Sequence, residues 1–249
     1  MKTTRLVFTL CAAILAAAPL VAGSGSGAHW GYEGKTGPKN WGDLDKKYHM
    51  CKEGMNQSPI NITKTADAEL DPIEFGYKPS RINVVNNGHT IKADYDAGSD
   101  ISIDGRYFEL KQFHFHTPSE NHIEGKSYPM EAHFVHADRY GNLAVVGVVY
   151  EIGEADEELE KIWENMPKKN GAHYKSKHTV DGMKLLPSDK AYYRFSGSLT
   201  TPPCSEGVLW LVLKQPMTAS KAQVQKFHKL FHHDTNRPVQ PLNARKVLQ

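Results

Sequence analysis

A short alternating segment, Gln112-Phe113-His114-Phe115-His116, constrains the fold of this 249-residue chain more than any other feature. A β-strand projects successive side chains to opposite faces, so His114 and His116 would share one face and the two phenylalanines the other. If residues 130–136 pair with this strand, His133 can join the two imidazoles, and three nitrogen ligands leave a tetrahedral zinc with one open position. The segment therefore predicts a sheet that carries a catalytic metal site.

Strand signals dominate the rest of the chain. Runs of β-branched and aromatic residues are separated by Gly, Pro, Asn and Asp, and they cover 84–85, 90–95, 107–116, 131–137, 144–150, 192–195 and 208–214. The runs 145–150 and 208–213 are apolar on both faces, which is typical of strands in the middle of a covered sheet. Two helices are expected, one over 154–165 that ends before Pro167 and one that Ser220 caps and that runs to about Phe231. No linker divides the chain, so one mainly β domain is expected.

The N-terminal residues have the pattern of a secretory signal peptide. Lys2 and Arg5 precede an apolar run over 6–18, and small residues follow at 22–24. This pattern predicts a signal peptide over 1–23 and a mature domain over 24–249. The apolar run is too short to span a bilayer, and no later stretch reaches the roughly 20 apolar residues required. The mature chain is expected in the periplasm or secreted, without a membrane span.

Charge and cysteine content agree with export. The formal net charge of +2 includes Lys2 and Arg5, so the chain without residues 1–23 has a formal charge of zero. Electrostatics therefore give no argument for binding nucleic acid or an anionic membrane. Cys11 lies in the apolar run, which leaves Cys51 and Cys204, and an exported chain with one possible pair is expected to form a disulfide. Two buried free thiols are the alternative.

Two of the three histidines are preceded by a polar residue on the same strand face. Gln112 stands two positions before His114, and Glu131 stands two positions before His133. A metal-bound imidazole usually donates its other N–H to a carboxylate or carbonyl oxygen, which fixes the orientation of the ring. A single histidine in a strand is more often a core or surface residue than a ligand, but three histidines with these neighbours favour zinc.

Seven motifs together resemble an α-class carbonic anhydrase of the exported bacterial type. They occur in the order and spacing of that family between about Trp30 and Arg245. The motifs are Ser58-Pro59-Ile60-Asn61, Asn87-Gly88-His89, Gln112 to His116, Ser119-Glu120, Glu131 to Val135, Ser198 to Cys204, and Asn236 to Gln240. The resemblance implies a mixed α+β single domain with a large, twisted, mostly antiparallel central sheet and short peripheral helices. It also implies zinc at the base of a conical cleft and the reversible hydration of CO2 to bicarbonate and a proton.

The resemblance assigns roles to the residues around the metal. His114, His116 and His133 would hold Zn²⁺, and Glu120 and Thr200 would orient the nucleophile, a zinc-bound hydroxide. An ionised Glu120 can only accept hydrogen bonds, so it would fix the Thr200 proton and leave the Thr200 oxygen as an acceptor. The other implied site residues are Val135, Val145, Leu199, Thr201 and Trp210 around the CO2, and Gln112, Glu131, Tyr32 and Asn87 in support. Val135 also shares a strand face with His133, whereas the sequence alone reads Val145, Leu199 and Trp210 as core.

His89 is the candidate proton shuttle. An imidazole with a pKa near its ordinary value of about 6.5 can relay a proton from the metal site to buffer. The simpler interpretation is that His89 only follows the Asn87-Gly88 turn. Lys92 departs from the small neutral polar residue common in the family, and a positive charge near the cleft would disfavour protonated His89.

Two other function classes stay open. One is a non-catalytic carbonic anhydrase-related binding protein, although such members typically lose a zinc-binding histidine. The other is a different zinc hydrolase, but the His-Glu-x-x-His pattern is absent, and Lys229 follows His228 where that pattern needs glutamate. His228 and His232 are better read as a solvated helix face. The same hydroxide can hydrolyse esters as a side reaction, and the resemblance also allows a homodimer.

Overall fold

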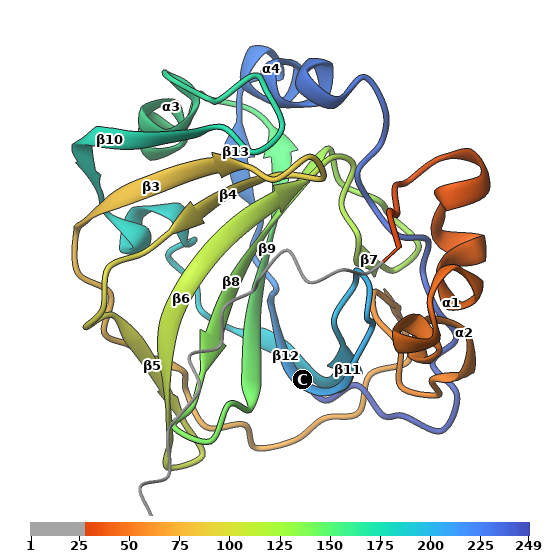
Figure 1. The fold of residues 1–249 in the computed structure, drawn as a ribbon. Coiled ribbons are helices and arrows are strands. Elements are labelled where there is room, and N and C mark those ends of the chain that lie inside the picture. Colours follow the sequence, from red (N-terminus) through yellow and green to blue (C-terminus); the bar gives the residue numbers. More distant parts are fainter. Residues whose placement is uncertain (1–27) are drawn as a thin grey trace, which may run out of the picture.

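The computed structural model describes residues 28–249, so the expected signal peptide lies outside the described residues. An eleven-stranded sheet forms the body of the domain, with the path β10-β3-β4-β6-β8-β9-β12-β11 and with β5, β2 and β13 beside it. The long strands β6 (Arg106–His116), β8 (Met130–Ala137) and β9 (Leu143–Ile152) cross its middle (Figure 1). Most neighbouring strands are antiparallel, whereas β9 pairs in parallel with β12 and β13. The mostly antiparallel sheet predicted for the chain is confirmed.

All seven predicted strand regions are present. They correspond to β3 (Ser80–Asn86), β4 (Ile91–Asp94), β6, β8, β9, β11 (Tyr192–Ser198) and β12 (Glu206–Leu213). The sequence analysis missed six further strands: β1 (Asn61–Ile62), β2 (Glu74–Phe75), β5 (Asp100–Ile103), β7 (His122–Ile123), β10 (His173–Val180) and β13 (Met217–Ala219). Five of these six have only two to four residues, too few for an alternating pattern to stand out.

The two expected helices are also present. Helix α3 (Glu157–Trp163) begins at Asp156, whose side chain accepts the Leu159 N–H. Helix α4 (Lys221–Phe231) begins with a capping box in which Ser220 and Gln223 each accept the other's backbone N–H. The remaining helical turns are short: α1 (Trp41–Leu44), α2 (Met50–Glu53), and the 3-10 turns η1 (Gly34–Thr36), η2 (Pro38–Asn40), η3 (Lys46–Tyr48) and η4 (Gly182–Leu185). No helix in the described part of the chain is long and apolar enough to cross a membrane.

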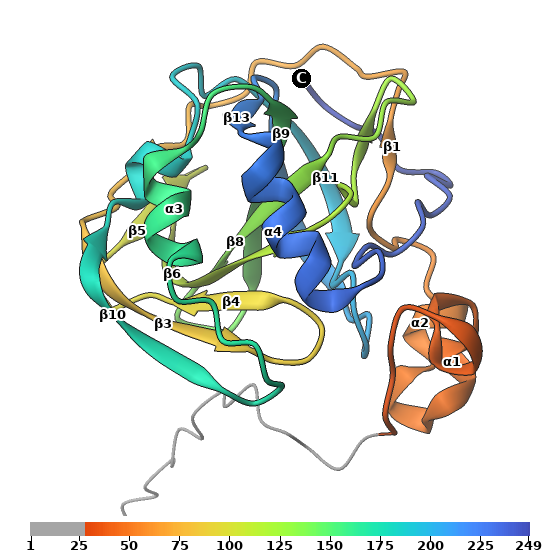
Figure 2. The ribbon, with the colours of Figure 1, turned by 90° about the horizontal axis from the view of Figure 1, so that it is seen from above.

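The main core lies on the side of the sheet that α3 and α4 cover, as the view from above shows (Figure 2). Phe113 and Phe115 of β6 are fully buried there. Phe115 packs edge-on against Trp163 of α3 and also contacts Phe227 of α4. A smaller cluster that includes Val145 and Trp210 forms on the other side. Burial of the phenylalanine face thus fixes the register of β6 and directs its histidines to the opposite face.

Candidate metal centre

Three imidazoles converge on the face of the sheet opposite the phenylalanines. His114 and His116 lie on β6, and His133 lies on β8 directly opposite His114 in the antiparallel register. One ring nitrogen from each histidine lies within 4.8 Å of the other two, and this is the one such group of potential metal ligands found among residues 28–249. The expected pairing of residues 130–136 with the first strand is therefore present, and it places the three side chains together.

Each imidazole has an oxygen beside the nitrogen that faces away from the centre. His114 Nδ1 lies 2.9 Å from Gln112 Oε1, and His133 Nε2 lies 3.0 Å from Glu131 Oε1. His116 Nδ1 lies 2.6 Å from the Thr235 carbonyl oxygen. The sequence analysis found the first two partners but missed Thr235. His116 Nε2 is buried and has no hydrogen-bond partner among the described residues, as expected of a nitrogen left for a metal.

The protonation of the centre suits a cation. Burial is the largest cause that lowers the pKa of His114 and of His116, and the neighbouring histidines lower that of His114 further. Neutral imidazoles are the form that coordinates metals. Burial alone would raise the pKa of Glu131, but its interactions with His133 and Asn121 leave it below its ordinary value. Two backbone N–H groups and the Asn121 amide, each at 2.8 Å, hold the Glu131 carboxylate.

Glu120 lies directly behind the histidines. Its Oε1 accepts the Arg237 backbone N–H at 2.8 Å, and its Oε2 lies 3.4 Å from His116 Nε2 without a hydrogen-bond partner in the described chain. Burial raises the pKa of Glu120 to about 7, while His133, the Arg237 N–H and the Thr200 hydroxyl act in the opposite direction. Thr200 therefore favours the ionised form of Glu120, although Glu120 Oε2 has no hydrogen-bond partner in the described chain.

A cavity of about 270 Å³ opens onto the three histidines. The cavity wall contains the apolar residues that were expected around CO2 and the polar residues that were expected beside the histidines. The expected residues that line it are Tyr32, Asn87, His89, Lys92, Gln112, Val135, Val145, Leu199, Thr200, Thr201 and Trp210. Glu120 and Glu131 do not line the cavity and support the centre from behind.

His89 differs from its expected state. Its ring stacks on Trp30 with centroids 3.6 Å apart and an interplanar angle of 9°. Burial, with smaller contributions from the nearby His29 and His233, lowers the pKa of His89 from 6.5 to about 4. Lys92 is paired with Asp94 at 2.5 Å and is not among the causes of this shift. The stacked environment, rather than the lysine, therefore makes His89 a weaker base than the sequence suggested.

The other candidate ligands remain separate from this centre. His228 Nε2 lies 3.1 Å from Asp234 Oδ1, and His232 forms the left-handed C-cap of α4. Neither belongs to a three-ligand group in the described part of the chain. This agrees with the interpretation of the pair as a solvated helix face.

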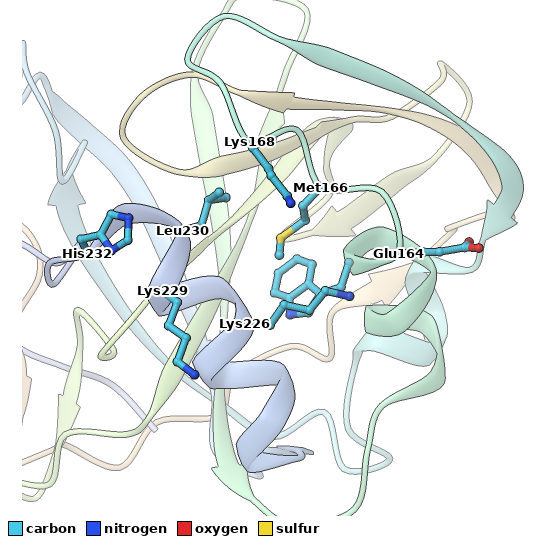
Figure 3. Close-up of a pocket in the computed structure, with 8 residues that line it drawn as sticks. Glu164, Met166, Lys168, Lys226, Lys229, Leu230 and His232 are labelled. Atoms are coloured by element: carbon cyan, nitrogen blue, oxygen red, sulfur yellow. The ribbon is translucent and has the colours of Figure 1, made fainter.

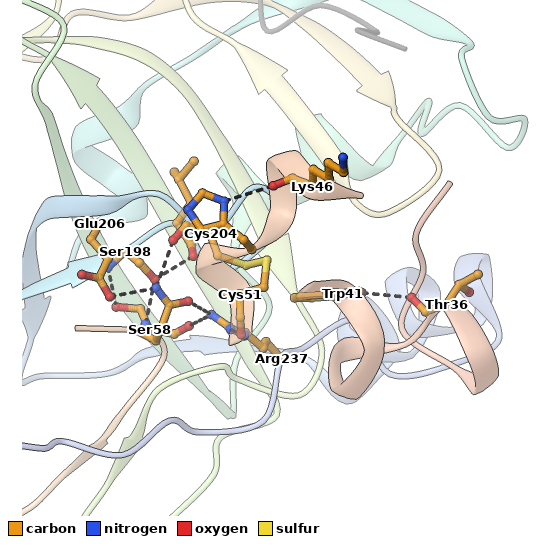
Figure 4. Close-up of a disulfide and its surroundings, with 12 residues drawn as sticks. Thr36, Trp41, Lys46, Cys51, Ser58, Ser198, Cys204, Glu206 and Arg237 are labelled. Atoms are coloured by element: carbon orange, nitrogen blue, oxygen red, sulfur yellow. Dashed lines mark hydrogen bonds between the residues drawn. A yellow bond between two sulfur atoms is a disulfide. The ribbon is translucent and has the colours of Figure 1, made fainter. Parts of the chain in front are cut away.

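The expected disulfide joins Cys51 to Cys204 and ties the α2 segment to the loop that follows β11 (Figure 4). The guanidinium of Arg237 lies beside the disulfide. Its Nη2 donates to the Cys51 carbonyl oxygen at 2.9 Å. Its Nη1 donates to Gln57 Oε1 and to the Ser58 carbonyl oxygen, both at 2.8 Å. The backbone N–H of the same arginine holds Glu120. The disulfide region and the carboxylate behind the histidines thus share one buried residue, whose role the sequence analysis did not find.

Comparison with known proteins identifies the family. Residues 36–249 match the model of the eukaryotic-type carbonic anhydrase family. A carbonic anhydrase of Neisseria gonorrhoeae is 47% identical over 249 residues, covering 100% of this chain and 96% of the relative. A carbonic anhydrase of Klebsiella pneumoniae is 51% identical and covers 89% of this chain and 91% of the relative.

Solved structures of carbonic anhydrases have the same fold as this chain. The α-carbonic anhydrase of Thermovibrio ammonificans, solved in complex with the inhibitor sulfanilamide, has a TM-score of 0.88 and 52% identity. It covers 90% of this chain and 100% of its own. A hyperthermostable carbonic anhydrase from a hydrothermal vent chimney has a TM-score of 0.87 and 57% identity, covering 88% of this chain and 99% of its own. Sequence and fold agree over most of the chain, which therefore belongs to the eukaryotic-type, or α, family of carbonic anhydrases.

Proposed function

We propose that this carbonic anhydrase is a zinc enzyme that hydrates CO2 reversibly to bicarbonate and a proton, with His114, His116 and His133 as the ligands. The convergence of three imidazoles, each with an oxygen beside its outward nitrogen, carries the proposal. Imidazole nitrogens in this number are typical of catalytic zinc. Bound zinc would supply an acidified water as nucleophile, because three uncharged ligands leave the full charge of the cation in place.

Glu120 and Thr200 orient that nucleophile in the proposed reaction. A cation at the histidines favours the ionised form of Glu120. The ionised carboxylate accepts the Thr200 proton, so the Thr200 oxygen can only accept a hydrogen bond from the nucleophile. This arrangement directs a lone pair of the nucleophile toward the carbon of CO2. The apolar side chains of Val135, Leu199 and Trp210 offer an uncharged wall for the substrate.

The Thr200→Ala variant tests this orientation. We expect kcat/KM for CO2 hydration to fall at least ~10-fold. The nucleophile loses the Thr200 oxygen as its hydrogen-bond acceptor, while the three histidine ligands stay in place. Zinc content should remain at one ion per chain. Thr200→Ser keeps the hydroxyl and should retain most of the activity. Unchanged hydration by Thr200→Ala would remove Thr200 from the mechanism.

We propose His89 as the group that relays protons between the cleft and buffer. It lines the same cavity as the candidate zinc ligands. Its pKa of about 4 in the position stacked on Trp30 keeps the imidazole neutral, a form that can accept a proton but holds it weakly. His89→Ala should lower kcat roughly tenfold in dilute buffer. The value of kcat/KM should stay constant, because proton release follows the attack on CO2. Added imidazole should restore kcat, and the exposed His178→Ala variant is the control. Equal kcat values for wild type and His89→Ala would exclude the role.

Stopped-flow CO2 hydration combined with metal analysis tests the function as a whole. Zinc at one equivalent with rapid, chelator-sensitive hydration is the expected result. A metal-bound chain without hydration would indicate the non-catalytic binding class, and hydrolysis of another substrate without hydration would indicate a different zinc hydrolase. Ester hydrolysis alone would not separate these classes.

We further propose that residues 1–23 are a signal peptide and that 24–249 are exported to the periplasm or secreted. The Cys51–Cys204 disulfide supports an oxidising compartment. N-terminal sequencing of the protein recovered from the periplasm or medium should begin near residue 24.

A further inference from the structure

Lys92 is the one side chain with a permanent charge among the described residues that line the cleft at the histidines. The other lining residues are apolar, neutral polar or histidine, and Glu120 and Glu131 lie behind the histidines rather than in the wall. Strand pairing fixes the position of the lysine, because Lys92 of β4 lies directly opposite His114 of β6. Side chains of directly opposed residues point to the same face, with Cβ atoms about 4.5–5.5 Å apart. A cation therefore stands in the wall beside the candidate metal centre.

A carboxylate outside the lining holds this cation. Lys92 Nζ donates to Asp94 Oδ1 at 2.5 Å, and Asp94 Oδ2 accepts from the Asn83 side-chain amide at 3.3 Å. The side chain of Asp94 is 41% exposed, against 27% for Lys92, so solvent screens the carboxylate more than the ammonium. The ammonium has three N–H groups, and the contact with Asp94 leaves donors for a ligand in the cleft.

The charge of Lys92 acts at the centre. It is one of the causes that lower the pKa of His114, after burial and the charges of His116 and His133. Asp94 is not among these causes. The neighbouring carboxylate thus leaves part of the positive charge uncompensated at the histidines.

The lysines around a second hollow are arranged differently. This hollow of about 390 Å³ lies between the end of α3 and the last turns of α4, with Lys168, Lys226 and Lys229 around it (Figure 3). Figure 3 shows Lys229 directed away from the hollow, and Lys226 is paired with Glu160. Their charges do not converge on one point, whereas Lys92 shares the cleft with the candidate metal ligands.

The two carbon species of the proposed reaction differ in charge, since CO2 is neutral and bicarbonate is an anion. We propose, on the basis of that reaction, that Lys92 is a specificity-determining residue that strengthens the binding of bicarbonate and other small anions in the cleft. Asp94 limits this effect by compensating part of the charge. Electrostatic attraction at a partly buried position is screened less than at the surface. The lysine therefore favours the anionic partner of the reaction, and neutral CO2 gains nothing from it.

Thiocyanate binding to the cobalt-substituted protein tests the proposal without turnover. Co²⁺ replaces the proposed Zn²⁺, and its visible spectrum reports the bound anion. Lys92→Gln should bind thiocyanate roughly threefold more weakly, and Asp94→Asn should bind it roughly threefold more tightly, since one partly exposed charge contributes modestly. Displacement of thiocyanate by bicarbonate should give the same order of affinities for bicarbonate. Both differences should shrink as sodium sulfate raises the ionic strength.

The opposite signs of the two effects separate charge from structure. Loss of an ion pair that only stabilises the strand would change binding in the same direction in Lys92→Gln and Asp94→Asn, and that result would overturn the proposal. Lys111 and Glu109 form the same kind of pair on β6, outside the cleft lining. Lys111→Gln and Glu109→Gln change the net charge equally and should bind like wild type. Equal effects in this control pair, or unchanged binding in the first two variants, would also overturn the proposal.

Failure of the proposed function gives a different result. A protein without an anion-sensitive cobalt spectrum would contradict the three-histidine centre and with it both proposals. A normal spectrum with anion binding that is independent of the charges at Lys92 and Asp94 would overturn only the role of Lys92.

Discussion

Replacing His133 with alanine is expected to abolish CO2 hydration and to remove zinc from the purified enzyme. The variant leaves two imidazoles on β6, which cannot complete a three-nitrogen set. It also leaves the buried Glu131 carboxylate without the imidazole 3.0 Å away. Loss of an outer partner of a ligand alone costs about 10–100-fold in metal affinity, so loss of the ligand should exceed about 100-fold. Metal content after dialysis and stopped-flow hydration measure the two effects.

A control must separate metal loss from general damage. His173 is an exposed histidine at the start of β10, and His173→Ala should keep both zinc and activity. Circular dichroism of His133→Ala should still report the sheet, because the phenylalanine face of β6 remains buried. Full zinc content and activity in His133→Ala would contradict the ligand assignment and would leave only two histidines in the centre.

The sheet was predictable where one face is buried. Along β6 the phenylalanines face the main core and the histidines face the cleft, so the alternation is visible in the sequence. Strand β10 was missed although its eight residues are enough to show an alternating apolar pattern, because it has no such pattern. It pairs only with β3 at the end of the sheet path, five of its eight residues are exposed, and its register shifts between Lys175 and Thr179. An edge strand with few buried residues has little apolar periodicity to read.

The candidate metal site was predictable where its parts are close in sequence. Gln112 and Glu131 precede their histidines by two residues, so strand geometry alone brings each pair together. Thr235 and Arg237 could not be found in this way, because they act through a backbone carbonyl and a backbone N–H. Such groups exist at every non-proline residue, and only the tertiary fold selects one of them. The lowered pKa of His89 likewise depends on Trp30, whose stacking the sequence does not reveal.

Arg237 connects the centre to the disulfide. Its guanidinium holds the Cys51 carbonyl oxygen, and its backbone N–H holds Glu120. Gln57 adds a second connection, because its Nε2 donates to the Cys204 carbonyl oxygen at 3.0 Å. The loop between β11 and Cys204 carries Thr200, which is therefore held at one end by the sheet and at the other by the disulfide. In the proposed mechanism, this segment therefore links the disulfide to the threonine that orients the nucleophile.

Replacing both Cys51 and Cys204 with alanine is expected to destabilise the protein strongly. The two residues are 153 positions apart, and the chain-entropy model gives a loss of up to about 5 kcal/mol in the free energy of unfolding for a loop of this length. Urea unfolding followed by tryptophan fluorescence should show a lower midpoint and a slope at least as steep, because the unfolded chain without the cross-link exposes more surface. Below that midpoint, kcat/KM for hydration should also fall, because the Thr200 loop loses its second attachment.

Reduction provides the matched control, since it opens the same bond without changing the sequence. Wild-type protein kept reduced with dithiothreitol should unfold at nearly the same urea concentration as the Cys51→Ala/Cys204→Ala variant. Any remaining difference reports the loss of the buried Cys204 side chain, which is fully inaccessible to solvent. If the double variant unfolds at the same midpoint as oxidised wild type, the disulfide does not stabilise this fold. If its midpoint falls but kcat/KM does not, Arg237 and Gln57 alone are sufficient to position Thr200.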